Sequence, residues 1–368
     1  MFHGIRNASL PLLLLAPAAA APSRQEAQDA EKAKEPPRFA LRLGYGKDFG
    51  WTSTTKSVRE QEAHLKQKFE FAVGGETQKH ENEVDFSEHE DLDSRVKMEF
   101  LDAEKGEVRR ARYTLEEQRT KRRRERDGEV VEKDDAPKSA EIEGCEIAFR
   151  WGEEENEVEV KGGSLEKDER EGFTESLKHR DLNPFVAYLL PKDPVAVGET
   201  WTLEGRALRQ ILNHALGDSE DEERARKALP KDVRYQADLS GELRAKLEEV
   251  LEKDGRKVAV VSIAGKPKEE GSTESDGTES SWKATYEVSG TLRFSLDLGI
   301  PEEVDFSASA KKSETHTGEQ EAEAGEGEGA AEADRTFSFS GSSVLTLKRE
   351  FRTVSVPLRE PEADAGKK

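Results

Sequence analysis

Only one cysteine, Cys145, occurs among the 368 residues. No intramolecular disulfide can form, so the fold must rest on burial of apolar surface, even in an oxidising compartment. Cys145 lies in the stretch 144–149, which has the composition of a strand. We therefore expect a small buried side chain rather than a nucleophile or an intermolecular link.

Apolar residues are scarce as well. Hydrophobic residues make up 33% of the chain and charged residues 37%, which is a low apolar share for a globular protein. The apolar residues must then be concentrated in patterned segments that are separated by long polar stretches. Beyond the N-terminus, no segment reaches the roughly 20 apolar residues that a membrane-spanning helix needs. The mature protein is therefore expected to be soluble.

Positive charge is in deficit. The chain has 58 Lys and Arg against 79 Asp and Glu, a formal net charge of −21. This charge favours solubility and argues against nucleic acid or an anionic membrane as the main partner, because both are themselves negatively charged. We expect no nucleic-acid partner.

The motifs of common enzyme classes are missing. The sequence contains no G-x-S-x-G, H-E-x-x-H or Walker loop. Ser-x-x-Lys occurs five times, as chance gives in a chain rich in both residues, and its companion motifs S-D-N and K-T-G are absent. His80 and His89 flank an acidic run, but one helix or turn does not fix ligands at that spacing. We expect a non-catalytic protein with neither a cofactor nor a metal.

The N-terminus has the pattern of an export signal. A weakly basic start precedes the apolar run Leu10–Ala16, and the small residues Ala18–Ala21 follow. This pattern predicts a signal peptide over residues 1–20. Residues 21–37, which are mostly Ala, Glu, Lys, Gln and Pro, predict a disordered leader. The protein is expected to be exported, to the periplasm or outside the cell.

A strict alternation runs from Trp282 to Leu298. Every even position is apolar or glycine, and every odd position is polar or charged. Successive side chains of a strand point to opposite faces, so this segment predicts a long strand with one dry face. Gly290 marks either a bend within one strand or a break between two. The fold class predicted is mainly β: a large curved antiparallel sheet or half-barrel meander, with a few short helices in the middle of the chain.

The pattern predicts a single β-rich domain over residues 38–358. It can also be divided into two sheet halves, 38–163 and 192–358, joined by a partly helical segment. Asp127–Gly128 and Asp254–Gly255 predict tight hairpins. Between them, apolar residues spaced one, three and four apart over Arg206–Leu216 predict an amphipathic helix.

Two acidic inserts interrupt the strand pattern. Residues 268–280 and 311–335 contain almost no large apolar residues, so burial of their own side chains cannot offset the entropy lost on ordering. We expect both to be disordered loops. Residues 359–368 are expected to be a disordered tail.

One segment resembles a family. Residues 190–201 contain the pattern P-x-x-P-V-x-V-G-x-x-W, and Gly290 to Gly299 contains G-x-x-x-F-x-x-x-x-G. Both patterns are similar to stretches of uncharacterised exported proteins of Gram-negative bacteria. The resemblance implies a β-rich secreted or periplasmic protein and supplies no activity. Pro194 and Gly198 would bracket a turn or an edge entry, and Trp201 would cap a core.

A basic run interrupts the acidic sequence. Its members are Arg119, Lys121, Arg122, Arg123, Arg124 and Arg126. The run could hold an anionic glycan or a lipid head group. Alternatively, it is an exposed edge strand whose charge prevents aggregation, neutralised by Glu116, Glu117 and Glu125. We favour the second interpretation.

Two functions remain open. In the first, the protein is a non-catalytic binding or scaffold protein of unknown ligand, with its sheet covered by its own helices. In the second, it carries a lipid or another hydrophobic ligand on a concave face. The face would be lined by Trp282, Tyr286, Leu292, Phe294 and Leu296. The outcome depends on whether the helix over 207–216 fills this face. An outer-membrane barrel is a more distant third, since only the last meander has the alternation it requires.

Overall fold

The computed structural model describes residues 36–44, 49–73, 76–104, 107–150, 156–178, 184–216, 234–275, 277–321 and 335–358. By its internal contacts the chain divides into two units, Met1–Pro37 and Arg38–Lys368. All strands and helices below belong to the second unit. The predicted signal peptide, nearly all of the predicted leader and the predicted tail lie outside the described residues.

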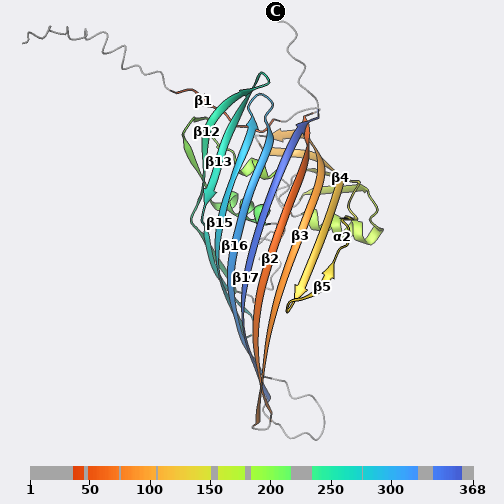
Figure 1. Ribbon diagram of the computed structural model, residues 1–368, viewed down its shortest axis with the longest axis vertical. Coiled ribbons are helices and arrows are strands. Elements are labelled where there is room, and N and C mark those ends of the chain that lie inside the picture. Colours follow the sequence, from red (N-terminus) through yellow and green to blue (C-terminus); the bar gives the residue numbers. More distant parts are fainter. Residues whose placement is uncertain are drawn as a thin grey trace, which may run out of the picture. The chain divides into compact units, whose positions relative to one another are not determined.

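Strands dominate this unit (Figure 1). The strands are β1 (Arg38–Phe39), β2 (Gly50–Val73), β3 (Glu76–Glu104), β4 (Glu107–Arg126), β5 (Glu129–Lys133), β6 (Lys138–Ser139), β7 (Cys145–Arg150), β8 (Glu157–Gly162), β9 (Val195–Ala196), β10 (Thr200–Leu203), β11 (Arg234–Ser240), β12 (Leu243–Lys253), β13 (Arg256–Gly265), β14 (Lys268–Ser275), β15 (Thr278–Ser295), β16 (Ile300–Glu321) and β17 (Arg335–Pro357). The helices are α2 (Lys167–Lys178), the 3-10 turn η1 (Phe185–Tyr188) and α3 (Gly205–Leu216).

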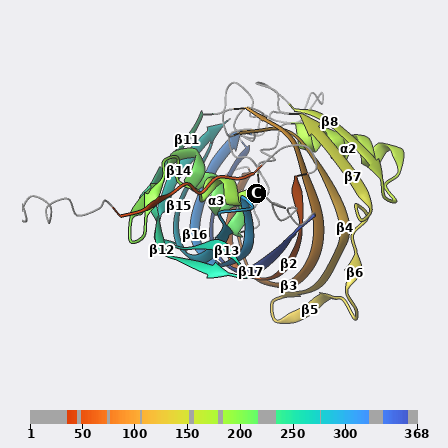
Figure 2. The ribbon, with the colours of Figure 1, turned by 90° about the horizontal axis from the view of Figure 1, so that it is seen from above.

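One antiparallel sheet contains almost all of these strands. Its order is β10-β12-β13-β15-β16-β17-β2-β3-β4-β7-β8. β14 pairs with β15 and β11, β5 and β6 pair with β4, and β1 pairs only with β9. Among the described residues, β10 and β8 do not pair with each other, so the sheet is open. Figure 2 shows it curving around α3. The predicted large curved antiparallel sheet is confirmed.

Local sequence signals set several of these elements. Asp127–Gly128 joins β4 to β5, and Asp254–Gly255 joins β12 to β13. All four residues have positive φ, between 50° and 79°, as the tight hairpin turn requires. The helix predicted over Arg206–Leu216 is α3, which begins one residue earlier. These predictions hold because turn chemistry and helical periodicity act over a few residues.

Successive side chains of β15 point alternately to the two faces of the sheet. We call the side of the sheet that α3 contacts the inner face, and the opposite side the outer face. Leu208, Ile211, Leu212 and Ala215 of α3 share one buried cluster with inner-facing residues of β12, β13, β15, β16 and β17. A hydrogen-bonded link holds the helix there: Glu269 of β14 accepts from Tyr286 Oη at 2.6 Å and from Arg209 Nη1 at 3.2 Å. α3 therefore covers the inner face over these strands.

Gly290 lies within one continuous strand. β15 pairs with β16 on both sides of this position, where Gly290 faces Phe306. A Cβ at Gly290 would lie 2.4 Å from the Phe306 ring and 2.8 Å from the Asp305 carbonyl oxygen. The glycine is therefore required by the close approach of that ring, and no break occurs. The strand ends at Ser295 rather than Leu298, because the chain turns before Ile300.

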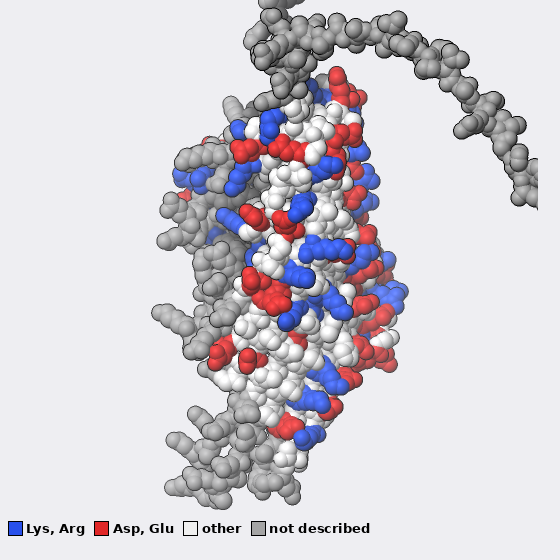
Figure 3. All heavy atoms as spheres, turned by 90° about the vertical axis from the view of Figure 1, so that its left-hand side faces the viewer, with Lys and Arg blue, Asp and Glu red and all other residues white. Residues whose placement is uncertain are grey.

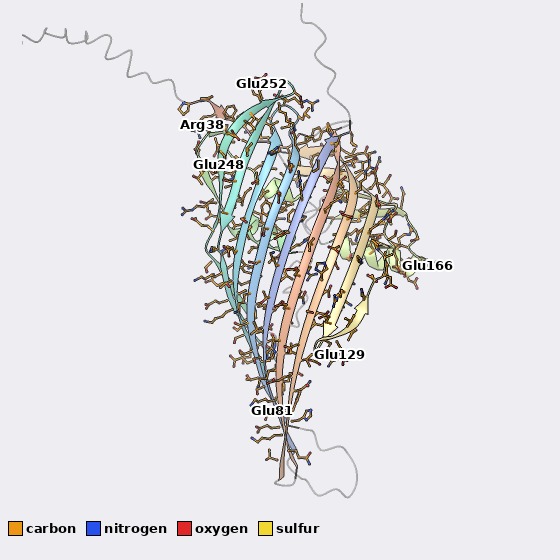
Figure 4. All side chains as sticks on the ribbon, in the orientation of Figure 1. Arg38, Glu81, Glu129, Glu166, Glu248 and Glu252 are labelled. Atoms are coloured by element: carbon orange, nitrogen blue, oxygen red, sulfur yellow. The ribbon has the colours of Figure 1, made fainter. Side chains whose placement is uncertain are left out.

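The outer face of the longest hairpin carries opposite charges in register. β2 and β3 pair through 24 consecutive residue pairs, Gly50↔Glu99 to Val73↔Glu76. Across them His64 Nδ1 lies 2.7 Å from Asp85, Lys68 lies 2.7 Å from Glu81, and Lys66 pairs with Glu83. Figure 4 shows Glu81 toward the narrow end of the sheet. Such exposed pairs stabilise weakly, but like charges in this register would oppose pairing.

The prediction of disorder for residues 268–280 is wrong. Lys268–Ser275 forms β14, and β15 begins at Thr278. β14 pairs with β11 on one side and β15 on the other, so its backbone groups are satisfied although its side chains are polar. The neighbouring strands, and not the segment's own apolar residues, offset the entropy of ordering.

The second acidic insert is strand at both of its ends. Residues 311–321 continue β16, and Arg335 begins β17. The two strands pair out to Glu321↔Thr336. The prediction of a loop over 311–335 is therefore wrong for these residues, and 322–334 lie outside the described part of the chain.

A second apolar cluster closes one end of the sheet. Its fully buried members are Trp51, Phe100, Ala111, Phe149 and Ile300. Beside it, α2 packs through Leu177 against Cys145 and Val160. Cys145 is fully buried, and burial raises the pKa of its thiol. The expectation of a small buried side chain is confirmed.

Candidate functional site

The five residues predicted to line a ligand face do not form one. Leu292 and Phe294 are 0% exposed and lie in the cluster around α3. Tyr286 and Leu296 pack against the same cluster. Trp282, 9% exposed, lies at the wall of a separate hollow. α3 thus covers the face that the carrier hypothesis requires to be accessible.

The basic run is split between the two faces of the sheet. All six residues lie on β4, where alternate side chains point to opposite sides. The register places Arg122 and Arg124 opposite Glu90 and Glu88 of β3, on the inner face. Arg119, Lys121 and Arg123 have the opposite phase. The six basic residues between positions 119 and 126 therefore do not form a single patch on the surface of the protein.

The run is also not a free edge. β4 pairs with β3 on one side, and with β5, β6 and β7 on the other. Of the three carboxylates expected to neutralise the run, Glu117 pairs with Arg119 and Glu125 with Arg123, whereas Glu116 pairs with Arg95. The interpretation as an exposed edge strand is wrong, because three further strands cover that edge.

A band of charged residues crosses the inner face instead. We call it the inner charge band: Arg349 of β17, Arg59 of β2, Glu88 and Glu90 of β3, and Arg122 and Arg124 of β4. One register line joins Arg349 to Arg59, Arg59 to Glu90, and Glu90 to Arg122. The carboxylates are well covered, with the side chains of Glu88 and Glu90 11% and 16% exposed. The band therefore holds charges in a partly desolvated setting, where they interact strongly.

The β3 and β4 part of the band is internally neutralised. Glu90 accepts from Arg122 Nη2 at 2.6 Å, and Glu88 accepts from Arg124 Nε at 2.9 Å. Arg124 Nη1 also donates to Glu132 of β5 at 2.9 Å. Glu88 and Glu132 raise the pKa of Arg124. Arg122 and Arg124 are therefore already paired with carboxylates of the protein.

Arg59 and Arg349 are different. Arg349 donates to Ser57 Oγ and to the His214 carbonyl oxygen, each at 2.8 Å. Arg59 donates to Gln61 Oε1 at 2.9 Å, and its buried Nε has no hydrogen-bond partner among the described residues. Neither guanidinium has a carboxylate within ion-pair distance in the described part of the chain. Burial and then the charge of Arg59 lower the pKa of Arg349, and the charge of Glu90 opposes them. The two cations therefore lie near one carboxylate that is already hydrogen-bonded to Arg122.

His214 lies beside Arg349 and does not add a third positive charge at pH 7. Its ring stacks on Phe185 with centroids 4.3 Å apart, and Phe351 lies edge-on at 5.6 Å. The residue as a whole is exposed, although its ring lies against these two aromatic rings. The surrounding protein, and then the charge of Arg349, lower the pKa of His214 to about 4. The imidazole is therefore neutral at pH 7.

Apolar residues continue the inner face beyond the band. Two further register lines join Leu345 to Ala63 and Phe86, and Ser343 to Leu65 and Val84. The set Ala63, Leu65, Val84, Phe86 and Leu345 is here called the open inner face. All five are partly exposed, Leu65 by 37%. The cluster around α3 includes no residue of β2, β3 or β4.

Two hollows lie elsewhere on the sheet. One of about 760 Å³ is lined by β11, β14, β15 and β16, including Asp238, Glu270 and Lys283. Another of about 580 Å³ is lined by both signs of charge, including Lys56, Asp93 and Arg119. Figure 3 likewise shows acidic and basic side chains interspersed over the side it draws. Charges of both signs line each hollow, so neither selects a ligand by its charge.

The described residues also give no support to a metal site or a membrane-spanning helix. Among the described residues, no three His, Cys, Asp or Glu side chains are grouped to hold a metal. His89 instead lies 3.4 Å from Asp91 and 4.0 Å from Glu60. None of the described helices has the length and apolar character needed to cross a membrane.

The segment that carries the family resemblance forms a turn and a core contact. Glu199 Oε2 accepts from the Ala196 backbone N–H at 2.8 Å, and Gly198 has φ 86°. Trp201 Nε1 donates to the Leu189 carbonyl oxygen at 3.0 Å, and its ring packs against the cluster around α3. This geometry fits a structural role for the motif.

Sequence reasoning missed Arg59 and Arg349. Each is one cation in a chain rich in them, and neither belongs to a run. The alternation of inward and outward positions along the strand could have identified Arg349, because it has the same inward phase as Leu347 and Phe351. A charged residue at an inward position is costly unless it has a partner or a function.

Comparison with known proteins leaves the chain without a family. No family model matches the sequence, and no curated protein matches it. Among solved structures, Pseudomonas aeruginosa OccK5 (OpdH) aligns over 86% of this chain and 100% of its own, at 7% identity and a TM-score of 0.17. The loop L8 deletion mutant of OmpT, an outer membrane protein of Vibrio cholerae, aligns over 78% and 99%, at 5% identity and a TM-score of 0.15. Likeness at this level supports no inference.

Proposed function

We propose that this chain is an exported, non-catalytic binding protein that holds its ligand on the inner face of β17, β2 and β3. The observation that supports this proposal is the contrast along that face. α3 covers buried inner side chains of β15 and β16 such as Leu292 and Phe306, whereas the open inner face and the inner charge band keep partly exposed apolar and charged groups together. Binding sites typically combine an apolar surface with a few placed polar groups.

Export is part of the same proposal and rests on the N-terminal sequence. The weakly basic start, the apolar run Leu10–Ala16 and the alanines after it support a cleaved signal peptide. N-terminal sequencing of the protein from a periplasmic fraction tests this. We expect the mature chain to begin at Ala21, and an intact Met1 would contradict export.

The binding face is tested by native mass spectrometry of the protein purified from periplasm. We expect a co-purifying molecule that is lost in the variant Leu65→Glu, which places a charge on the open inner face. Val58→Glu is the matched control, because Val58 lies on the outer face of the same strand and is similarly exposed, by 40%. Ligand retention in Leu65→Glu, or equal loss in both variants, would contradict the proposed face.

A further inference from the structure

We infer that the ligand is a single-chain anionic amphiphile, whose carboxylate lies against Arg59 and Arg349 and whose hydrocarbon chain lies on the open inner face. This inference rests on the proposed function and names the chemistry of its ligand. It starts from the unbalanced charge at one end of the inner charge band and the apolar surface that adjoins it.

The inner charge band carries more positive than negative charge. Its four arginines face Glu88 and Glu90 within the band, with Glu132 beside them, leaving an excess of one positive charge. Both carboxylates of the band are engaged by Arg122 and Arg124, so the excess resides at Arg59 and Arg349. A partly desolvated guanidinium is stabilised by an anion that accepts its N–H groups.

The hydrogen bonds of Arg59 are also incomplete. Arg59 Nε is buried and has no partner among the described residues. Guanidinium N–H groups form a planar fork that matches the two oxygens of a carboxylate. An anion beside the Arg59 guanidinium would counter the repulsion between Arg59 and Arg349. Neutral His214 adds no further cation at pH 7.

The position of the apolar residues then selects an amphiphile over a simple anion. From Arg59, inner-facing positions of β2 proceed through Gln61 and Ala63 to Leu65, a distance of roughly 20 Å at about 3.3 Å per residue. Leu345 and Phe86 flank Ala63 in register. A charged head at Arg59 therefore places an attached chain along a partly exposed apolar track.

The test measures binding of palmitate by equilibrium dialysis, with hexadecanol as the uncharged probe of the same length and inorganic phosphate as the chainless anion. We expect the wild type to bind palmitate at least tenfold more tightly than hexadecanol, and phosphate to compete only weakly. Arg59→Gln should weaken palmitate binding by about tenfold or more, as for loss of one charge-assisted hydrogen bond, and leave hexadecanol unchanged.

Two controls keep the result interpretable. Lys56→Gln removes the same charge from the outer face of β2, where Lys56 is exposed beside Asp93, and should change palmitate binding less than twofold. Arg59 rather than Arg349 is substituted, because Arg349 also holds the end of α3 through the His214 carbonyl oxygen. Urea unfolding of each variant verifies that it is folded.

The outcomes separate the two proposals. Equal palmitate binding by the wild type and Arg59→Gln, or equal affinity for palmitate and hexadecanol, overturns the anionic head group. If Leu65→Glu still abolishes hexadecanol binding, the proposed binding face stands without the anion site. Competition by phosphate as strong as that by palmitate assigns the arginines to a simple anion and overturns the amphiphile. No binding of any probe, with no co-purifying ligand, overturns both proposals.

Discussion

Two regions of one sheet face differ in what covers them. Over β15 and β16 the inner residues Leu292 and Phe294 are 0% exposed beneath α3, whereas over β2 the inner residue Leu65 is 37% exposed. Both regions follow the same alternation along their strands. Alternation therefore decides which face a side chain occupies, and the amphipathic helix decides whether that face is a core or a surface.

The two regions also treat polar groups differently. Under α3, the buried carboxylate of Glu269 has two donors, Tyr286 and Arg209. In the inner charge band, Arg59 keeps a buried N–H without a described partner. The carboxylate under α3 is satisfied inside the protein, whereas the Arg59 guanidinium has no carboxylate within ion-pair distance in the described part of the chain.

The largest effect is expected at the centre of the covered region. Phe294→Ala should lower the free energy of unfolding by about 3–5 kcal/mol, as for other buried aromatic truncations. Arg293→Ala, on the outer face one residue away, should change it by no more than about 0.5 kcal/mol. Urea unfolding measures both. Equal losses would mean that both faces are buried here.

A smaller effect is expected from the link between the sheet and α3. Tyr286→Phe removes one of the two donors to the buried Glu269, so we expect a loss of about 1–3 kcal/mol. Thr285→Ala, an exposed neighbour on the outer face, serves as the control. If the two variants unfold at the same urea concentration, Glu269 is not held as described.

The free energy of unfolding should depend on pH through His214. Because the pKa of His214 is about 4 in the folded protein and 6.5 is its ordinary value, the unfolded chain binds the extra proton first as the pH falls. Stability should therefore decline from about pH 6.5 toward pH 4, and be retained above 6.5. His214→Gln should flatten this decline in urea unfolding at pH 7, 6 and 5. His64→Gln, at an exposed site on β2, should preserve it.

The smallest effect is expected on the open inner face. Leu65→Ala should lower the free energy of unfolding by less than about 1 kcal/mol, because the side chain is already partly in water. Leu292→Ala, at an inner position under α3, should lose about 2–5 kcal/mol. A loss at Leu65 that matches Leu292 would show a covered core there and remove the contrast between the regions.

Several elements were predictable because their causes are local. The β15 strand followed from its alternation, α3 from its apolar spacing, and the two hairpins from Asp-Gly pairs that adopt positive φ. The strand formed by residues 268–275 was not predictable from composition. Its order comes from β11 and β15 on either side, and no property of its own residues reports that.

The candidate site shows the same division. The sequence displayed a basic run on β4, but register divides Arg122 and Arg124 from Arg123 and pairs them with carboxylates 32 to 36 residues away. Arg59 and Arg349 are 290 positions apart in the chain and adjacent only through the pairing of β2 with β17.

The sequence by itself determined the alternating strand β15 with its inward and outward phases, the helix α3 and the two Asp-Gly turns, because each depends on dihedral preferences and periodicity over a few residues. Only the tertiary structure decided where α3 packs, which inner residues remain exposed and which arginine lacks a counter-charge. Those properties arise from contacts between strands that are distant in the chain, and no local pattern records them.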